Sequence, residues 1–250
     1  MSLNPIAESR PLALGNIFSL DAGQVFLVCG EPAPDALQAG LQRWLTQKER
    51  ERLQRFRNAE SRAVYISAHA VLNALLQTYT GIPVPQLPFA YGPQQKPLLD
   101  LDLEKPTLGF NLSHSKGYFL IGLAKSQEIG VDVESHRVKV RIEHLAQQFF
   151  HPNEQAALKE SPHPRQLFFD LWVRKEAFLK ATGMGLSFPT TQFDATLSVI
   201  DLPFQQIHLG NLPFFEHASA AFAVERAPLS LKAHHVRHTN DWDALLHAAP

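Results

Sequence analysis

The stretch Gly130-Val131-Asp132-Val133-Glu134 is the one from which the fold can be worked out. As a strand it alternates, so Val131 and Val133 point to one face and Asp132 and Glu134 to the other. Neighbouring carboxylates repel each other when they are partly buried, and a divalent cation removes that cost. Oxygen ligands of this kind suit Mg²⁺. The alternative is an edge strand whose acidic face is solvated.

The composition is that of an ordinary globular protein. Of the 250 residues, 45% are hydrophobic and 19% are charged, and the formal net charge is −1. A nearly neutral chain does not favour nucleic acid as its main partner. The sequence contains no run of about 18 apolar residues, so we expect no membrane association. The single cysteine, Cys29, excludes an internal disulfide and favours a reducing compartment, and we expect a cytoplasmic protein.

The hydrophobic pattern predicts helices and strands in both halves of the chain. In the first half we expect a loosely structured lead at 1–23, strands at 24–29, 108–112 and 118–124, helices at 36–56 and 60–79, and loop with short strand at 83–105. In the second half we expect strands at 129–134, 206–209 and 220–224, and helices at 142–150, 152–160 and 165–182. Each half thus has one long amphipathic helix and several strands, which suggests a duplicated architecture.

The helix expected at 165–182 carries Glu176 and Lys180 four residues apart, so both lie on one face. In an ordinary surface helix such a pair is only a weak ion pair. Here the surrounding segment is rich in aromatic residues and should be well packed. Glu176 beside Asp132 and Glu134 would make a three-carboxylate cation site. Lys180, one turn further along, would face whatever the cation holds.

The segment 110–115 contains two hydroxyls and an imidazole, at Ser113, His114 and Ser115. We expect these residues in a polar turn, 113–117, that connects two strands. Such groups can bind phosphate through hydrogen bonds. The alternative is that a Ser-His-Ser turn only satisfies its own backbone.

Three stretches, 110–115, 129–134 and 172–186, resemble the three signature motifs of the Sfp-type phosphopantetheinyl transferases, in the family's order and at similar separations. The motif Trp-x-x-Lys-Glu-Ala-x-x-Lys-x-x-Gly-x-Gly-Leu is met at every fixed position from Trp172 to Leu186. A looser resemblance covers most of the chain. We therefore interpret the carboxylate strand as part of a site that this family shares.

The resemblance implies an α+β fold of two similar halves, arranged as a pseudo-dimer with coenzyme A in the cleft between them. We place the boundary between residues 1–126, for coenzyme A binding and carrier contacts, and residues 127–250, for the metal site and the catalytic helix. The implied reaction moves the 4′-phosphopantetheine arm of coenzyme A to a serine of an apo acyl or peptidyl carrier protein, releasing adenosine 3′,5′-bisphosphate. Such carriers serve fatty-acid, polyketide or peptide synthesis. The duplicated halves favour a monomer.

The same resemblance implies roles for four residues. Asp132, Glu134 and Glu176 would bind Mg²⁺, and Glu176 would take the proton of the acceptor serine, directly or through a metal-bound water. Lys180 would stabilise or protonate the leaving phosphate. The chemistry suits these residue types, because attack on a diphosphate is catalysed mostly by positioning and charge stabilisation. A serine hydroxyl also needs a nearby base at neutral pH.

Coenzyme A itself would be contacted by Ser113, His114 and Lys96. Arg52 aligns with the basic position that holds the extra phosphate of the nucleotide. The chain departs from the family pattern at Gln95, where a glycine is usual, and this change bears on the loop around the adenosine.

Two other functions would use the same acidic residues. The first is a Mg²⁺-dependent phosphohydrolase, in which water replaces the serine, and the second is a non-catalytic module that binds carrier proteins. The intact set of motif residues argues against the second. Separately, His234, His235 and His238 have a spacing that could bind zinc, although a solvated tail is the favoured interpretation.

Overall fold

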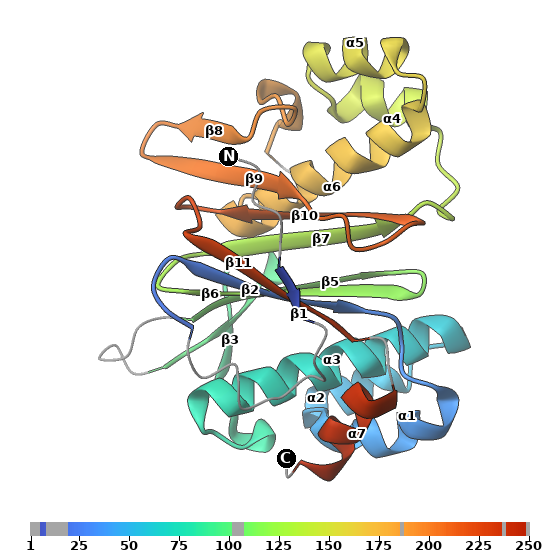
Figure 1. Cartoon of the computed structure of the whole chain (residues 1–250), viewed down its shortest axis with the longest axis vertical. Coiled ribbons are helices and arrows are strands. Elements are labelled where there is room, and N and C mark those ends of the chain that lie inside the picture. Colours follow the sequence, from blue (N-terminus) through green and yellow to red (C-terminus); the bar gives the residue numbers. More distant parts are fainter. Residues whose placement is uncertain (1–5, 9–19, 102–107, 186–187, 237–238, 249–250) are drawn as a thin grey trace.

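Figure 1 shows the computed structural model, in which helices form the two outer layers and strands the inner part. The structure describes residues 6–8, 20–101, 108–185, 188–236 and 239–248. Most of the lead expected at 1–23 lies outside these ranges, as do Leu186 and His238. In the described part of the chain, no helix is both long enough and apolar enough to cross a membrane.

Helices and strands alternate along the chain. The α-helices are α1 (Asp35–Leu41), α2 (Gln47–Leu53), α3 (Ala59–Thr80), α4 (Ile142–Phe149), α5 (Pro152–Glu160), α6 (Pro164–Thr182) and α7 (Thr239–His247). The strands are β1 (Ile6–Glu8), β2 (Gln24–Gly30), β3 (Phe89–Tyr91), β4 (Pro97–Leu99), β5 (Leu108–Ser115), β6 (Tyr118–Lys125), β7 (Ile129–Ser135), β8 (Val199–Leu202), β9 (Gln205–Asn211), β10 (Ala218–Val224) and β11 (Ser230–Val236).

The strands form two main sheets that repeat one arrangement. Their orders are β1-β11-β2-β6-β5 and β7-β10-β9-β8, and β3 pairs with β4 in a small ribbon. Three strands of each sheet correspond. In the first sheet β2 pairs antiparallel with β6, the second strand of the β5–β6 hairpin. In the second sheet β7 pairs antiparallel with β10, the second strand of the β9–β10 hairpin. α3 covers the outer face of the first sheet and α6 that of the second (Figure 1). The predicted α+β fold of two similar halves is confirmed.

The alternation predicted for β7 is present. Val131 and Val133 are fully buried between the two sheets, where they meet side chains of β2 and β6 such as Leu27. Gly130 points the other way, and a Cβ there would collide with the carbonyl oxygen of Ala177 in α6. The glycine therefore lets α6 lie directly on the strand that carries the two carboxylates.

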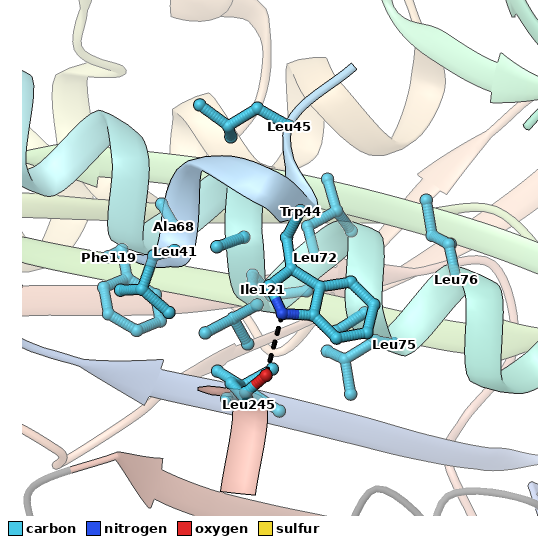
Figure 2. Packing of buried hydrophobic residues seen from close by; sticks show 14 of the residues in the cluster. Leu41, Trp44, Leu45, Ala68, Leu72, Leu75, Leu76, Phe119, Ile121 and Leu245 are labelled. Carbon is cyan, nitrogen blue, oxygen red and sulfur yellow. Dashed lines mark hydrogen bonds between the residues drawn. The ribbon is translucent and has the colours of Figure 1, made fainter. Parts of the chain in front are cut away.

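β11 and α7 return from the second half to the first. β11 pairs in parallel with β2, so β2 lies between β11 and β6. Trp44 donates a 2.9 Å hydrogen bond from Nε1 to the carbonyl of Leu245 in α7, within the core of the first half (Figure 2). The division between residues 126 and 127 stays a prediction about domains, but strands from both sides of it build the first sheet.

The single helix predicted at 36–56 is wrong, because the chain turns inward between α1 and α2. A 3₁₀ turn ends at Trp44, and Leu45 has an extended backbone with φ −88° and ψ 139°. Both side chains are only 1% exposed. Thr46 then caps α2: its hydroxyl accepts from Glu49 N, and the Glu49 carboxylate accepts from Thr46 N. Burial of two large apolar residues thus outweighs continuation of the helix.

Two further expectations are corrected. The polar turn predicted at 113–117 is wrong in its first part, because β5 continues to Ser115, which pairs with Tyr118. The tail is not solvated either: His234 is 5% exposed and its Nε2 lies 3.3 Å from Asp241 Oδ1. Among the described residues, no group of three His, Cys, Asp or Glu side chains is arranged to hold a metal, so nothing supports the zinc hypothesis.

Candidate functional site

Two neighbouring cavities lie beside the carboxylate strand. The larger, of about 520 Å³, is lined by residues of the first half, and the smaller, of about 220 Å³, lies between the first half and α6. The two cavities share Asn111 as a common wall. The remaining residues of the smaller cavity are Gln94, Lys96, Glu176, Leu179, Lys180, Gly183 and Gly185. Two predicted catalytic residues, Glu176 and Lys180, are therefore brought together on one cavity wall.

Side chains of β5 hold the two carboxylates of β7. These strands are edges of different sheets, so side chains join them. Ser113 donates from Oγ to Asp132 Oδ1 over 2.7 Å, and Ser115 donates from Oγ to Glu134 Oε1 over 2.9 Å. Burial raises the pKa of Glu134, and the Ser115 hydrogen bond opposes this shift. The serines thus fix the orientation of both carboxylates.

Lys180 reaches from α6 to the same strand. Its Nζ lies 2.6 Å from Asp132 Oδ1, and it also donates to Ser113 Oγ over 3.1 Å and to the Val131 carbonyl over 3.2 Å. The ammonium group is therefore anchored at the strand and part-buried at the wall of the smaller cavity.

Glu176 is the acid that the surroundings leave unpaired. It makes no hydrogen bond to any described residue. Burial, followed by the negative charge of Asp132, raises its pKa from 4.5 to about 7, with Lys180 opposing and Glu134 adding to the shift. A carboxyl group with a pKa near neutrality can take up and release a proton under ordinary conditions.

The loop between β3 and β4 forms the opposite wall of the smaller cavity. Lys96 is paired with Glu128 at 2.5 Å. Gln94 and Gln95 have left-handed backbones, with φ 55° and φ 61°. Gln94 packs on Gly185 so closely that a Cβ on that glycine would lie 2.5 Å from Gln94 Cγ. Gln94 is not among the residues predicted from the sequence, because no pattern in the chain indicates it.

The larger cavity contains two of the residues predicted to bind coenzyme A. Arg52 and His114 both line it, and so does Tyr65. The Arg52 guanidinium carbon lies 5.5 Å from the centroid of the Tyr65 ring. Burial, then the charges of His69, Lys180 and Arg52, lower the pKa of His114 from 6.5 to about 4. Ser113 is not among the residues that line this cavity or the smaller one; it contacts Asp132 and Lys180 instead.

A buried ion pair fixes α6 behind the site. Lys175, the neighbour of Glu176, points into the second core and lies 3.0 Å from Glu154 of α5, with the two side chains 3% and 0% exposed. Lys175 also donates to the carbonyls of Thr190 and Phe193. The motif lysine is thus structural, while the acid next to it faces the cavity. The smaller cavity thus combines two lysines with a part-buried acid, a lining whose charge suits an anionic ligand.

Comparisons with known proteins identify the family. Residues 31–127 match the family model described as 4′-phosphopantetheinyl transferase, N-terminal, and residues 128–237 match the 4′-phosphopantetheinyl transferase superfamily. Together the two models account for most of the chain. The protein belongs to the 4′-phosphopantetheinyl transferase superfamily, as the three motifs predicted.

Several curated relatives carry the same name. A Synechocystis sp. protein, slr0495, provisionally named a 4′-phosphopantetheinyl transferase, is 39% identical over 158 residues, or 62% of this chain and 64% of its own. The 4′-phosphopantetheinyl transferase HetI of Nostoc sp. is 34% identical over 62% of this chain and 66% of its own. The 4′-phosphopantetheinyl transferase Sfp of Bacillus subtilis is 28% identical over 62% of this chain and 67% of its own. The chain thus spans slightly less than two thirds of the first two relatives.

Proposed function

We propose that this protein transfers the 4′-phosphopantetheine arm of coenzyme A to a serine of an apo acyl or peptidyl carrier protein and releases adenosine 3′,5′-bisphosphate. One observation carries the proposal: Glu176 and Lys180, one turn apart on α6, line a cavity that shares a wall with a second, basic cavity of about 520 Å³. That volume suits a ligand the size of a nucleotide. The names of the curated relatives support the same reaction.

Glu176 acts as the general base in this proposal. Its pKa of about 7, caused first by burial and then by Asp132, keeps a large ionised fraction near neutral pH. A base of this strength is well matched to a serine hydroxyl, which is a poor nucleophile until its proton is removed. Because Glu176 makes no hydrogen bond to another described residue, its carboxylate has oxygens available both for that proton and for a cation.

Lys180 stabilises the leaving phosphate. Its ammonium group is held by Asp132, Ser113 and the Val131 carbonyl at the cavity wall, so little reorganisation is needed when negative charge grows there. Lys96, on the facing wall, adds a second positive charge. Arg52 and His114 in the larger cavity are the proposed contacts for the nucleotide phosphates.

Asp132, Glu134 and Glu176 are the proposed ligands of Mg²⁺. The set supplies only carboxylate oxygens, which magnesium prefers, and the charges of Asp132 and Glu134 help to raise the pKa of Glu176, so these acids are close enough to repel each other. Among the described residues, no three His, Cys, Asp or Glu side chains are arranged closely enough to hold a metal ion without moving. The donor chemistry fits, although Lys180 lies on Asp132. When bound, Mg²⁺ would neutralise charge on the diphosphate.

We further propose that the protein works as a monomer, because one chain supplies both walls of the smaller cavity. A cytoplasmic location is proposed from the single cysteine, which favours a reducing compartment. The carrier's serine must reach Glu176 in that cavity. Carriers of fatty-acid, polyketide and peptide synthesis are all candidates for this role.

A panel of apo carriers, incubated with the protein, coenzyme A and Mg²⁺, tests the proposal. Intact mass spectrometry should show carriers heavier by one phosphopantetheine arm, and chelation of the metal should stop the change. Free phosphopantetheine with an unchanged carrier would instead identify a phosphohydrolase. Tight carrier binding without modification would identify a non-catalytic module. No observation on the described residues favours either alternative.

A further inference from the structure

A separate cavity, of about 490 Å³, lies outside the candidate site and shares no described lining residue with the two cavities there. Its walls come from the connection between β2 and α1, the start of β6, the connection between β9 and β10, the end of β11, and α7. A cavity of this volume can enclose a small organic molecule. The proposed transfer reaction does not use it.

Aromatic rings form much of the wall of this cavity. The ring centroids of Tyr118 and Phe215 lie 4.7 Å apart, with their planes inclined at 51°. The ring of Phe214 is inclined at 89° to that of Phe215, and the ring of His235 at 79°. Rings that are inclined so steeply present faces in several directions, as the walls of a box do. Phe215 is the ring that the other three contact.

The charge of the lining is negative. Glu31 and Glu216 both line the cavity and are exposed, whereas no lysine or arginine is among its described lining residues. The cavities of the candidate site have the opposite character, since Lys180 lines the smaller one and Arg52 the larger. An anion such as coenzyme A is therefore favoured in the candidate site, and a cation in the separate cavity.

Aromatic faces and carboxylates attract the same kind of group. The face of an aromatic ring carries partial negative charge and attracts an ammonium or guanidinium group within about 6 Å of the ring centroid. An exposed carboxylate adds only a weak attraction, because water screens it. The rings must therefore supply most of the affinity, and the two glutamates a smaller part.

We propose that this cavity binds a small organic cation with an ammonium or guanidinium group. The rings of Tyr118, Phe214 and Phe215 surround the charged group, and the exposed carboxylates of Glu31 and Glu216 face it from the rim. The inference does not depend on the proposed transferase function, because neither coenzyme A nor a carrier takes part in it.

The first test compares a cation with a neutral molecule of the same shape. The probes are choline, the alcohol in which carbon replaces the nitrogen of choline, and agmatine as a guanidinium compound. NMR resonances of the Phe215 ring in the intact protein should shift as choline or agmatine is added. At least one cation should bind with a dissociation constant about 10-fold or more below that of the alcohol. Equal binding of the alcohol, or no binding of either cation, would overturn the inference.

Variants of the lining locate the bound cation. Phe215→Leu keeps an apolar side chain but removes the aromatic face, so the dissociation constant of the bound cation should rise by about 3- to 30-fold. Phe204→Leu is the matched control, because Phe204 is 100% exposed, lies between β8 and β9 and does not line the cavity. It should bind the cation as the natural protein does. A loss of equal size in the control would refute the assignment to this cavity.

Glu31→Gln provides a second variant at an exposed position, where the change should not disturb folding. The dissociation constant should rise by about 2- to 5-fold and depend less on salt. Unchanged binding in this variant and in folded Phe215→Leu would overturn the inference. Saturating coenzyme A should leave cation binding unchanged, since its proposed cavities have other lining residues. Displacement of the cation by coenzyme A would place it in the candidate site and refute the separate cavity as its site.

Discussion

The long helices of the two halves, α3 and α6, present polar side chains at the same spacing but use them in opposite ways. Each helix packs on the outer face of its sheet and ends at a glycine with a left-handed backbone, Gly81 or Gly183. The side chains four residues apart are Tyr65, His69 and Asn73 on α3, and Trp172, Glu176 and Lys180 on α6. The two helices differ in the hydrogen bonding of the nearby acid, which is Glu49 of α2 beside α3 and Glu176 on α6 itself.

On the α3 side, the acid is satisfied within the protein. Glu49 lies 2.5 Å from His69 Nδ1 and accepts from Asn73 Nδ2 over 2.7 Å. Burial raises the pKa of Glu49, but His69, Thr46 and Asn73 together lower it more, so its pKa lies below the ordinary value. On the α6 side, burial and Asp132 raise the pKa of Glu176 to about 7. A satisfied acid joins elements together, whereas an unsatisfied one remains available for an external proton.

The strongest way to break this comparison is Glu176→Gln. The amide has the same shape but cannot take a proton, so kcat/KM for transfer should fall by about 100- to 10,000-fold. Intact mass of the carrier measures this loss. The folded-state pKa of Glu176 is raised, so its contribution to stability is present below pH 4.5 and is lost as the pH rises through about 7. In urea unfolding, the free energy of unfolding of the variant should therefore not fall between pH 4.5 and 7 because of this residue.

Glu160→Gln is the control for this change, because Glu160 is an exposed residue at the end of α5. It should transfer normally. Turnover by Glu176→Gln close to that of the control would contradict the role of the unsatisfied acid.

Glu49→Gln is the same substitution on the satisfied acid, and it should act mainly on stability. Losing the charge that His69 and Asn73 face should reduce the free energy of unfolding by about 1–3 kcal/mol at neutral pH. The pKa of Glu49 is lowered in the fold, so the stabilisation is present above pH 4.5 and is lost as the pH falls. Urea unfolding should therefore show the two proteins converging in acid.

Glu51→Gln, on the exposed side of α2, should change stability little, because within the described part of the chain Glu51 hydrogen-bonds only to Gln47 and is solvent-exposed. If Glu49→Gln were as harmless as this control, the two helices would not differ in the way described.

His114→Gln sharpens the comparison through pH. The pKa of His114 falls from 6.5 to about 4 on folding, first because of burial, so the neutral ring contributes stability above pH 6.5 that is lost as the pH falls towards 4. The ring is exposed by surface area and solvent screens it, so the effect should be modest. Thermal unfolding across this pH range should show a shallower acid slope for the variant. His144→Gln, at an exposed position of α4, should keep the original slope.

Gln95→Gly tests the smallest expected effect. It compares Gln95, in the loop between β3 and β4, with Gly185, which follows α6 and has a similar left-handed backbone. Gln95 has φ 61° and Gly185 has φ 65°, but only glycine adopts such a backbone without strain. The variant should gain roughly 0.5 kcal/mol of stability in urea unfolding. Gln86→Gly, in a 3₁₀ turn where φ is not positive, should lose stability instead. A loss in both variants would show that no strain is stored at Gln95.

The sequence predicted the core of this architecture because its signals are local. Alternation along β7 separates Val131 from Asp132, and the spacing of four on α6 places Glu176 with Lys180. Both patterns depend only on the geometry of one element. The α+β fold of two similar halves then followed from the family's motifs, and the two sheets of the structure confirm it.

What the sequence did not reveal depends on contacts between distant segments. The break at Leu45 follows from docking of Trp44 under α7, which lies about two hundred residues away in the chain. The interpretation of 113–117 as a turn also concealed that Asn111, Ser113 and Ser115 share one face of a strand. Reading 110–115 with a period of two would have found that face.

The position of β2 between β6 and β11 has a consequence for biosynthesis. β2 is among the first strands to leave the ribosome, yet its second neighbour, β11, emerges only after the whole of the other half. Until then β2 keeps an open, apolar edge that can pair with another nascent chain. We therefore expect a chaperone that shields this edge during synthesis to raise the yield of folded protein.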